Sequence, residues 1–219
     1  MTEQFQLPEF VDNRGKLTFV EEIAHLPFEI SKVYLIDSAS VPEKIYLPGK
    51  TFLMTPVGSL TIDGTMHFHG IGEGVLADCN TGLSLKVSSG STLLILSEKP
   101  IKSLTPLKLP FRARRVYFMS EIPEGKSRGS HAHLTTSQLI FTLNGKFDVE
   151  LDNATTKKSV TLTSPLQPVE APVGIWHTLH SFTNNAVCMV IASELFNPDD
   201  YISDYSEFLD ISKSTPTND

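Results

Sequence analysis

The sequence predicts an all-β protein of sandwich or barrel type, with one short helix near its C-terminus. Three observations support this prediction. The 219 residues include 13 glycines and 14 prolines, which divide the chain into short segments. Those segments are rich in Val, Ile, Thr and Phe, as β-strands are, and only the last has a helical spacing of apolar residues. A chain of this length buries a substantial core, as one domain or two small ones.

An internal repeat indicates two halves. Residues 26–35 (LPFEISKVYL) closely resemble residues 109–118 (LPFRARRVYF), which lie 83 positions later. Residues 52–63 and 139–150 then match at an offset of 87, and each pair predicts a β-hairpin around turn residues. The proline-containing segment 98–106 is the best boundary. We therefore expect two tandem domains, residues 1–104 and 105–219.

A strand that leads into the second hairpin carries two histidines. His131 and His133 are separated by Ala132. Because strand side chains alternate between faces, both imidazoles are expected to project from one wall, with Ala132 on the other. The 87-residue offset places Lys44 and Tyr46 at the equivalent positions of the first half. Chemistry is therefore expected in the second half, and the first is interpreted as degenerate.

The first half has its own histidine pair, His67 and His69, in a turn-rich segment. No matching ligands follow these residues downstream. We interpret them as surface histidines.

The charge of the chain points to a small anionic ligand. The chain has 18 basic and 25 acidic residues, a formal charge of −7, which argues against a nucleic-acid partner. Basic residues nevertheless gather just before and within the histidine motif, where they favour a phosphorylated or nucleotide-linked ligand. They are Arg112, Arg114, Arg115, Lys126 and Arg128. Alternatively, they are solvated charges at strand ends.

Composition also favours a reducing compartment. The chain has only two cysteines, begins with polar residues and contains no run of about twenty apolar residues. We expect a cytoplasmic protein without a disulfide framework and without a membrane partner.

The last apolar segment predicts a helix over residues 198–209. Asp199 and Asp200 fall in its first turn, where negative charge suits the helix dipole. Its expected apolar face consists of Tyr201, Ile202, Tyr205, Phe208 and Leu209. This helix is expected to clamp the barrel and to carry no chemistry.

The second half resembles the two cupin motifs, which implies jelly-roll barrels. The matching residues are Gly125, Gly129, His131, His133, Gln138, Gly145 and the segment 172–177, which ends in His177. Metal-binding cupins use an acidic residue where this chain has Gln138. The neutral amide removes the only anionic ligand, so we expect no metal. If a metal is bound, its ligands are His131, His133 and His177.

A larger set of residues is similar to the dTDP-4-keto-6-deoxyglucose 3,4-ketoisomerases, a WxcM-like group of cupins. The set is Arg115-Val116-Tyr117, Arg128-Gly129, His131-Ala132-His133, Gln138, Asn144-Gly145, Leu151-Asp152, Trp176-His177, Ala192-Ser193 and Asp200-Tyr201-Ile202. The resemblance covers roughly residues 109–210. It implies an isomerase that moves the keto group of a dTDP-hexose from C4 to C3 through an enediol, without a cofactor, in deoxysugar biosynthesis for lipopolysaccharide or S-layer glycans.

The resemblance also implies an assembly. Members of this group are homodimers of single cupins, whereas this chain holds two. We expect a bicupin pseudo-dimer, with homodimerisation left open, in which the N-terminal strand completes the catalytic barrel.

Residue roles follow from the resemblance and from imidazole chemistry. His133 is expected to be the base, His131 its partner in proton transfer and Tyr117 a donor to the enolate oxygen. The expected substrate-binding residues are Arg128, Arg115, Gln138, Trp176 and His177. Two other functions stay open: a non-catalytic sugar-nucleotide binding cupin and a metal-dependent cupin enzyme.

Overall fold

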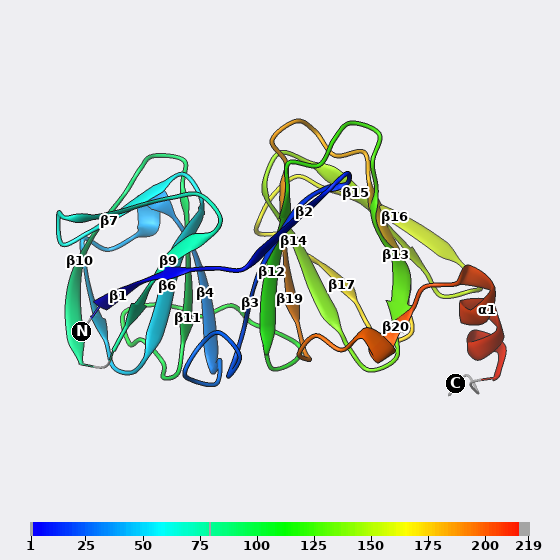
Figure 1. Ribbon diagram of the computed structural model, residues 1–219, viewed down its shortest axis with the longest axis horizontal. Helices are drawn as coiled ribbons and strands as arrows, with labels where there is room; N and C mark the ends of the chain where they lie inside the picture. The colour runs from blue at the N-terminus through cyan, green and yellow to red at the C-terminus, as the bar shows by residue number, and fades with distance from the viewer. Residues whose placement is uncertain (1, 79, 215–219) are drawn as a thin grey trace. The chain divides into compact units, whose positions relative to one another are not determined.

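The computed structural model describes residues 2–78 and 80–214, so Cys79 lies outside the described residues. The chain divides into two compact units (Figure 1). The first comprises residues 1–10 and 17–118, and the second residues 11–16 and 119–219. The prediction of an all-β fold of two jelly-roll barrels with a short C-terminal helix is confirmed, since nearly all regular structure is antiparallel strand.

Two antiparallel sheets form the first unit. One has the order β1 (Thr2–Gln6), β9 (Glu73–Ala77), β6 (Thr51–Val57), β11 (Thr92–Ser97) and β4 (Lys32–Asp37). The other has the order β5 (Lys44–Leu47), β10 (Thr81–Val87), β7 (Ser59–Ile62) and β8 (Met66–His69). A short 3-10 turn, η1 (Ser38–Ser40), follows β4.

The second unit also contains two sheets. One has the order β16 (Lys157–Leu162), β15 (Phe147–Asp152), β18 (Trp176–His180), β13 (Arg128–His133) and β20 (Tyr201–Ile202). In the other, β17 (Val169–Ala171), β14 (Gln138–Asn144) and β19 (Val187–Ala192) are neighbours. Three strands, β2 (Glu9–Asp12), β3 (Gly15–Glu21) and β12 (Arg115–Ser120), contribute residues to both units.

One strand order occurs twice, as the sequence repeat predicts. The order β9-β6-β11 of the first unit recurs as β17-β14-β19, and β8-β7-β10-β5 recurs as β16-β15-β18-β13. The sequence repeat predicts two cupin halves that meet between residues 104 and 105, and this boundary stays a prediction. The compact units divide between Phe118 and Met119 and also assign residues 11–16 to the second unit.

The interior of the first unit is apolar. Its core consists of Leu, Ile, Val, Phe and Tyr side chains from both sheets, among them Ile45 and Leu47 of β5. Lys44 and Tyr46, which the repeat aligns with the histidine pair, alternate with these residues and are exposed, Tyr46 to 58%. His67 and His69 lie exposed on β8, which confirms their interpretation as surface residues.

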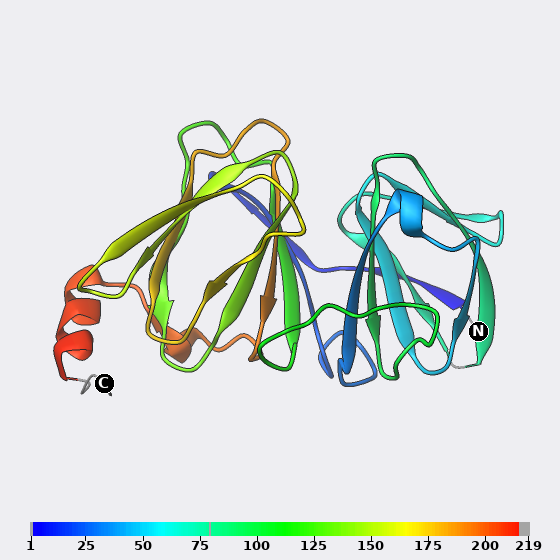
Figure 2. The ribbon, with the colours of Figure 1, turned by 180° about the vertical axis from the view of Figure 1, so that it is seen from behind.

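The C-terminal helix is shorter than predicted. Residues 198–200 form a 3-10 turn, η2 (Pro198–Asp200), then β20 pairs with β13, and the helix α1 spans Tyr205–Ser214. Figure 2 shows α1 from behind, beside the second unit. The prediction that Asp199 and Asp200 begin a helix is therefore wrong. No helix of residues 2–78 and 80–214 combines the length and apolar character that a membrane crossing requires.

Candidate active site

Three imidazoles meet on one face of the sheet that contains β13 and β18. His131 lies opposite His177 in the strand register, and its Nε2 is 3.2 Å from Nε2 of His133. Their candidate ligand atoms all lie within 4.8 Å of one another. Ala132 points to the other face, where it packs in an apolar cluster with Ile202. The strand alternation predicted from the sequence therefore holds.

A β-bulge just before the histidines shifts the strand register so that His131 lies opposite His177. The register between β13 and β18 shifts between Gly129 and His131. Gly129 has φ +74°, and a Cβ at this position would lie 2.8 Å from the carbonyl oxygen of His177. Only glycine accommodates both the left-handed backbone and this close approach.

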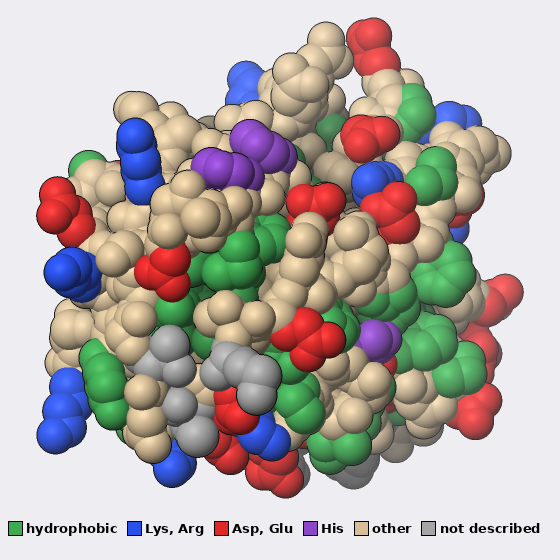
Figure 3. Space-filling view, turned by 60° about the vertical axis from the view of Figure 1, so that its left-hand side comes forward, with side chains coloured by type: hydrophobic (Ala, Val, Ile, Leu, Met, Phe, Trp, Pro, Cys, Tyr) green, Lys and Arg blue, Asp and Glu red, His purple; other side chains and the backbone are tan. Residues whose placement is uncertain are grey.

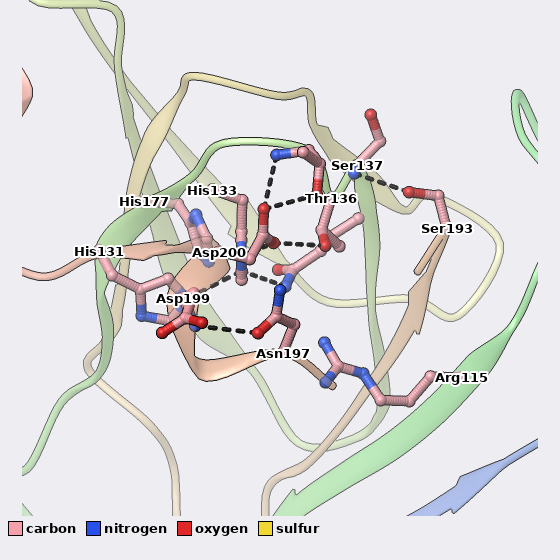
Figure 4. A network of polar contacts seen from close by, with 12 residues as sticks. Arg115, His131, His133, Thr136, Ser137, His177, Ser193, Asn197, Asp199 and Asp200 are labelled. Atoms are coloured by element: carbon pink, nitrogen blue, oxygen red, sulfur yellow. Dashed lines mark hydrogen bonds and ion pairs between the residues drawn. The ribbon is translucent and has the colours of Figure 1, made fainter. Parts of the chain in front are cut away.

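Asp200 is the residue that sequence reasoning missed. Its carboxylate is 5% exposed, and its Oδ2 lies 2.8 Å from Nδ1 of His133 (Figure 4). Oδ1 accepts hydrogen bonds from both the backbone nitrogen and the hydroxyl of Thr135, and Oδ2 accepts one from the hydroxyl of Thr136, each at 2.6 Å. Burial by itself raises the pKa of Asp200, but the contacts with Thr135, Thr136 and His133 lower it overall.

Gln138 contacts the other nitrogen of His133. Its Nε2 lies 2.8 Å from Nε2 of the imidazole, and its buried Oε1 has no hydrogen-bond partner within the described part of the chain. The structure therefore brings Gln138, an expected substrate-binding residue, into contact with His133.

His177 and Tyr201 complete the cluster. Burial, and then the neighbouring His131 and His133, lower the pKa of His177 to about 3, so this imidazole is neutral near pH 7. The ring of Tyr201 lies 4.5 Å from that of His133 and 4.8 Å from that of His131, between ring centroids. The sequence predicts Tyr201 on a helix face and gives it no role in the site. Its position instead follows from the pairing of β20 with β13.

Arg128 is buried in the second unit and has few partners. Only 8% of it is exposed, and its Nε and Nη2 have no hydrogen-bond partner in the described residues. Nη2 lies 3.8 Å from the carboxylate of Asp12, which is itself bound by Arg14 through the backbone nitrogen, Nε and Nη2 at 2.7–3.0 Å. A buried guanidinium with so little compensation is suited to an anionic ligand.

Trp176 does not lie with the imidazoles. Strand alternation places it on the face opposite His177, where it is buried with Ile202 and Phe208. Its ring packs against Tyr205, with centroids 5.1 Å apart. The prediction that Trp176 binds substrate is therefore corrected: it anchors α1.

The other expected residues belong to the first unit. Arg115 and Tyr117 lie in the part of β12 assigned to it, with the Arg115 guanidinium carbon 5.4 Å from the Tyr117 ring centroid. Arg112 and Arg114 bind the fully buried carboxylate of Glu22 at 2.6 and 2.8 Å. Two residues of the predicted basic patch thus form ion pairs within the fold. On the face drawn in Figure 3, Lys and Arg lie scattered among Asp and Glu.

The three imidazoles are a donor set that could hold a divalent metal ion. Nδ1 of His133 is bound to Asp200, which leaves Nε2 as its ligand atom, and the Gln138 amide nitrogen, 2.8 Å from Nε2, would have to move for a metal to bind there. The candidate cluster in the described residues consists of imidazoles alone, without a carboxylate.

Comparisons with known proteins match this half of the chain. The sequence profile of the family described as "FdtA: WxcM-like, C-terminal" matches residues 101–213. A TDP-4-oxo-6-deoxy-alpha-D-glucose-3,4-oxoisomerase from Aneurinibacillus thermoaerophilus is 35% identical over 100 residues, 46% of this chain and 72% of that protein. The region matched by the family profile, residues 101–213, contains all three imidazoles and Asp200.

Two solved structures are also similar. The sugar 3,4-ketoisomerase QdtA from Thermoanaerobacterium thermosaccharolyticum, in complex with TDP, is 30% identical with a TM-score of 0.48, over 50% of this chain and 83% of that one. WlaRA, a TDP-fucose-3,4-ketoisomerase from Campylobacter jejuni, is 21% identical with a TM-score of 0.48, over 52% and 88% of the two chains.

Proposed function

The chain belongs to the FdtA family of WxcM-like proteins, and on this premise we propose that it is a nucleotide-sugar 3,4-ketoisomerase. Its substrate is a dTDP-4-keto-6-deoxyhexose, the substrate class named for its relative. The observation that carries the proposal is the imidazole cluster, in which the buried His133 lies between the carboxylate of Asp200 and the ring of the partly buried His131. Such an arrangement is suited to moving a proton between neighbouring carbons without a redox step.

The proposed reaction uses His133 as base and His131 as its partner. His133 removes the proton from C3 as His131 delivers one to the C4 oxygen, which gives the 3,4-enediol. His131 then takes the proton of the C3 hydroxyl as His133 returns its proton to C4, which leaves the keto group at C3. The positive charge that His133 acquires is stabilised by Asp200 at 2.8 Å.

We assign substrate binding to residues around this cluster. Arg128 binds the pyrophosphate through its buried guanidinium, and Gln138 and His177 contact the sugar. For Arg115 and Tyr117, the roles of ligand binding and donation to the enolate oxygen remain part of the proposal and rest on the family resemblance.

His133→Asn tests the proposal directly. We expect loss of turnover with an unchanged circular dichroism spectrum and melting temperature, because Asn retains polar contacts but provides no base near neutral pH. His69→Asn, at an exposed position of the first unit, is the matched control and should leave activity intact. Turnover by the His133→Asn protein would refute the assigned base.

A non-catalytic sugar-nucleotide binding cupin is the alternative that the buried Arg128 also supports, because an anion site alone needs no base. Proton exchange separates the two functions. An isomerase incorporates solvent deuterium at C3 or C4 of the keto sugar, which NMR detects, whereas a binding protein leaves both carbons unlabelled.

A metal-dependent cupin enzyme is the second alternative, motivated by the three imidazole nitrogens within 4.8 Å. Elemental analysis of the purified protein tests it. Activity that survives chelation would exclude this alternative.

We further propose that the repeat provides two barrels within one polypeptide, as a bicupin pseudo-dimer whose first half is degenerate. The shared strand order and the apolar core of the first unit support this assignment. We also propose a cytoplasmic location, because the buried free thiol of Cys188 suits a reducing compartment.

A further inference from the structure

We propose that Asp200 is a positioning residue for the base: it fixes the tautomer of His133 so that Nδ1 carries the proton and Nε2 carries the lone pair. This inference rests on the proposed function only for its catalytic consequence. The tautomer itself follows from the contacts of the two side chains.

The carboxylate of Asp200 is surrounded by hydrogen-bond donors. Three of its contacts come from the loop between β13 and β14: the backbone nitrogen of Thr135 and the hydroxyls of Thr135 and Thr136, each at 2.6 Å (Figure 4). A backbone N–H can only donate, so Oδ1 must accept. Because hydrogen bonds to the charged form favour ionisation, Asp200 is an acceptor at both oxygens at neutral pH.

The neighbours of His133 specify the tautomer independently at both nitrogens. At Nδ1, the ionised Asp200 can only accept, so this nitrogen must carry the proton. At Nε2, the shorter contact is the amide nitrogen of Gln138, which can only donate, so this nitrogen must carry the lone pair. Nε2 of His131 lies 3.2 Å from the same atom and is then a donor as well. The two contacts therefore agree, and Nε2 is the basic atom.

Gln138 can yield this lone pair to a substrate. Its Oε1 is buried and has no hydrogen-bond partner in the described part of the chain, so the amide is held at its nitrogen end. A substrate C–H that approaches Nε2 takes the place of the amide donor.

The backbone around Asp200 holds it in register with its target. His133 pairs with Tyr201 in the β13–β20 ladder, and the backbone nitrogen of Leu134 donates to the carbonyl of Asp200 at 2.9 Å. The preceding turn is capped by Asn197, whose side chain accepts from the backbone nitrogen of Asp199. These contacts explain how a residue 67 positions away maintains a 2.8 Å contact with Nδ1.

Asp200→Asn makes a specific test possible. The amide oxygen must face the backbone N–H of Thr135, which places the amide nitrogen where Oδ2 was and presents a donor to Nδ1. His133 should then adopt the tautomer with hydrogen on Nε2. We expect kcat to fall on the order of 10³- to 10⁴-fold, as when the same change inverts a triad histidine, while KM changes only about twofold.

The tautomer is read by ¹⁵N NMR of imidazole-labelled protein, without substrate. Hydrogen on Nδ1 in the wild type and on Nε2 in Asp200→Asn supports the proposal, and the same tautomer in both proteins overturns it. An inverted tautomer with unchanged kcat overturns the catalytic role. Asp199→Asn, an exposed neighbour with the same chemical change, should leave both readouts unchanged.

A milder variant keeps the test decisive if Asp200→Asn does not fold. Thr136→Val has nearly the same volume and removes one donor to Oδ2, so kcat should fall by up to about tenfold without loss of the fold. No change in kcat would count against the proposal. If the wild type itself fails to isomerise the keto sugar, the proposed function is wrong, whereas the NMR comparison still decides the tautomer.

Discussion

At the scale of single residues, the three imidazoles differ in the charge that their surroundings allow. Burial and neighbouring imidazoles lower the pKa of His177 to about 3, so it stays neutral. His133 instead faces the carboxylate of Asp200, which stabilises an imidazolium. Adjacent groups in such different environments take different roles in acid–base chemistry. In the proposed reaction, a proton taken from the sugar is therefore held on His133, while His177 stays neutral.

Arg128 provides a prediction that separates binding from stability. Replacement of a buried, poorly compensated charge by an apolar side chain of similar length is often neutral or stabilising. We therefore expect Arg128→Met to preserve or raise the free energy of unfolding in urea, while the Kd for a dTDP-sugar, measured by calorimetry, rises about tenfold or more. Lys146→Met, which removes an exposed cation of the same unit, is the control. An unchanged Kd for Arg128→Met would contradict the assigned anion site.

At the scale of elements, the packing of α1 against β20 restrains the position of Asp200. Phe208 of α1 is buried with Trp176 and with Ile202 of β20. The hydroxyl of Tyr205 donates to Oδ2 of Asp152 at 2.6 Å. Because β20 follows Asp200 directly, the packing of α1 on the sheet also restrains the carboxylate that contacts His133. The helix thus contributes to the site without supplying a reacting group.

The Tyr205–Asp152 contact predicts a pH-dependent stability. Burial raises the pKa of Asp152, but contacts with Tyr205, Ala154 and Lys157 lower it overall below 3.8. Such a carboxylate stabilises the fold above its unfolded pKa and loses that contribution as pH falls through its folded pKa. Tyr205→Phe should lower the free energy of unfolding in urea at pH 7, and the difference from the wild type should shrink as pH falls below about 3.8.

Tyr46→Phe is the control for this prediction, since its hydroxyl contacts the neutral side chain of Asn80 at an exposed position. Its effect should be small and independent of pH. A pH-independent loss in Tyr205→Phe would show that the hydroxyl does not act through Asp152.

Local patterns in the sequence predicted the elements whose partners are near in the chain. The alternation around Ala132 placed both imidazoles on one wall. The turn residues Asn144-Gly145 do end a strand, but the predicted hairpins are wrong: β14 and β15 lie in different sheets, and so do β6 and β7. The helix was predicted several residues too early. The spacing of Tyr201, Ile202 and Tyr205 suits a helix, but the pairing of β20 with β13 decides the local structure. Tertiary pairing of this kind is not visible in a local period.

The same limit explains which site residues could be found. His131, His133 and Gln138 lie within one motif, and the cupin spacing adds His177. Asp200 is 67 residues from its partner, and its acidic neighbour at 199 favoured the interpretation as a helix start. The face on which Trp176 lies depends on the register between β18 and its neighbours. An acidic residue followed by two strand formers, Tyr201 and Ile202, is the one signal that favours β20.

At the scale of the whole molecule, the two units share one strand order but have different interiors. The first is filled by apolar side chains, whereas the second holds the imidazoles. The second unit also includes a segment from near the N-terminus, since residues 11–16 cluster with residues 119–219. Within that unit, Asp12 is the acidic partner nearest to Arg128. The second unit therefore includes a short segment that lies in the sequence between two segments of the first unit.

A single substitution at Gly15 tests whether the second unit depends on this segment. It has φ +112°, and a Cβ would lie 2.7 Å from the carbonyl oxygen of Ser120 and 2.8 Å from that of Glu121, both in the second unit. Gly64 also has a positive φ, +72°, but nothing within 4 Å, so Gly64→Ala isolates the backbone term of about 1 kcal/mol. We expect Gly15→Ala to cost about 2 kcal/mol or more in urea unfolding and to reduce isomerase activity, whereas Gly64→Ala retains it. Equal losses in both variants, or a folded and fully active chain that lacks residues 1–100, would show that the second unit does not need its N-terminal segment.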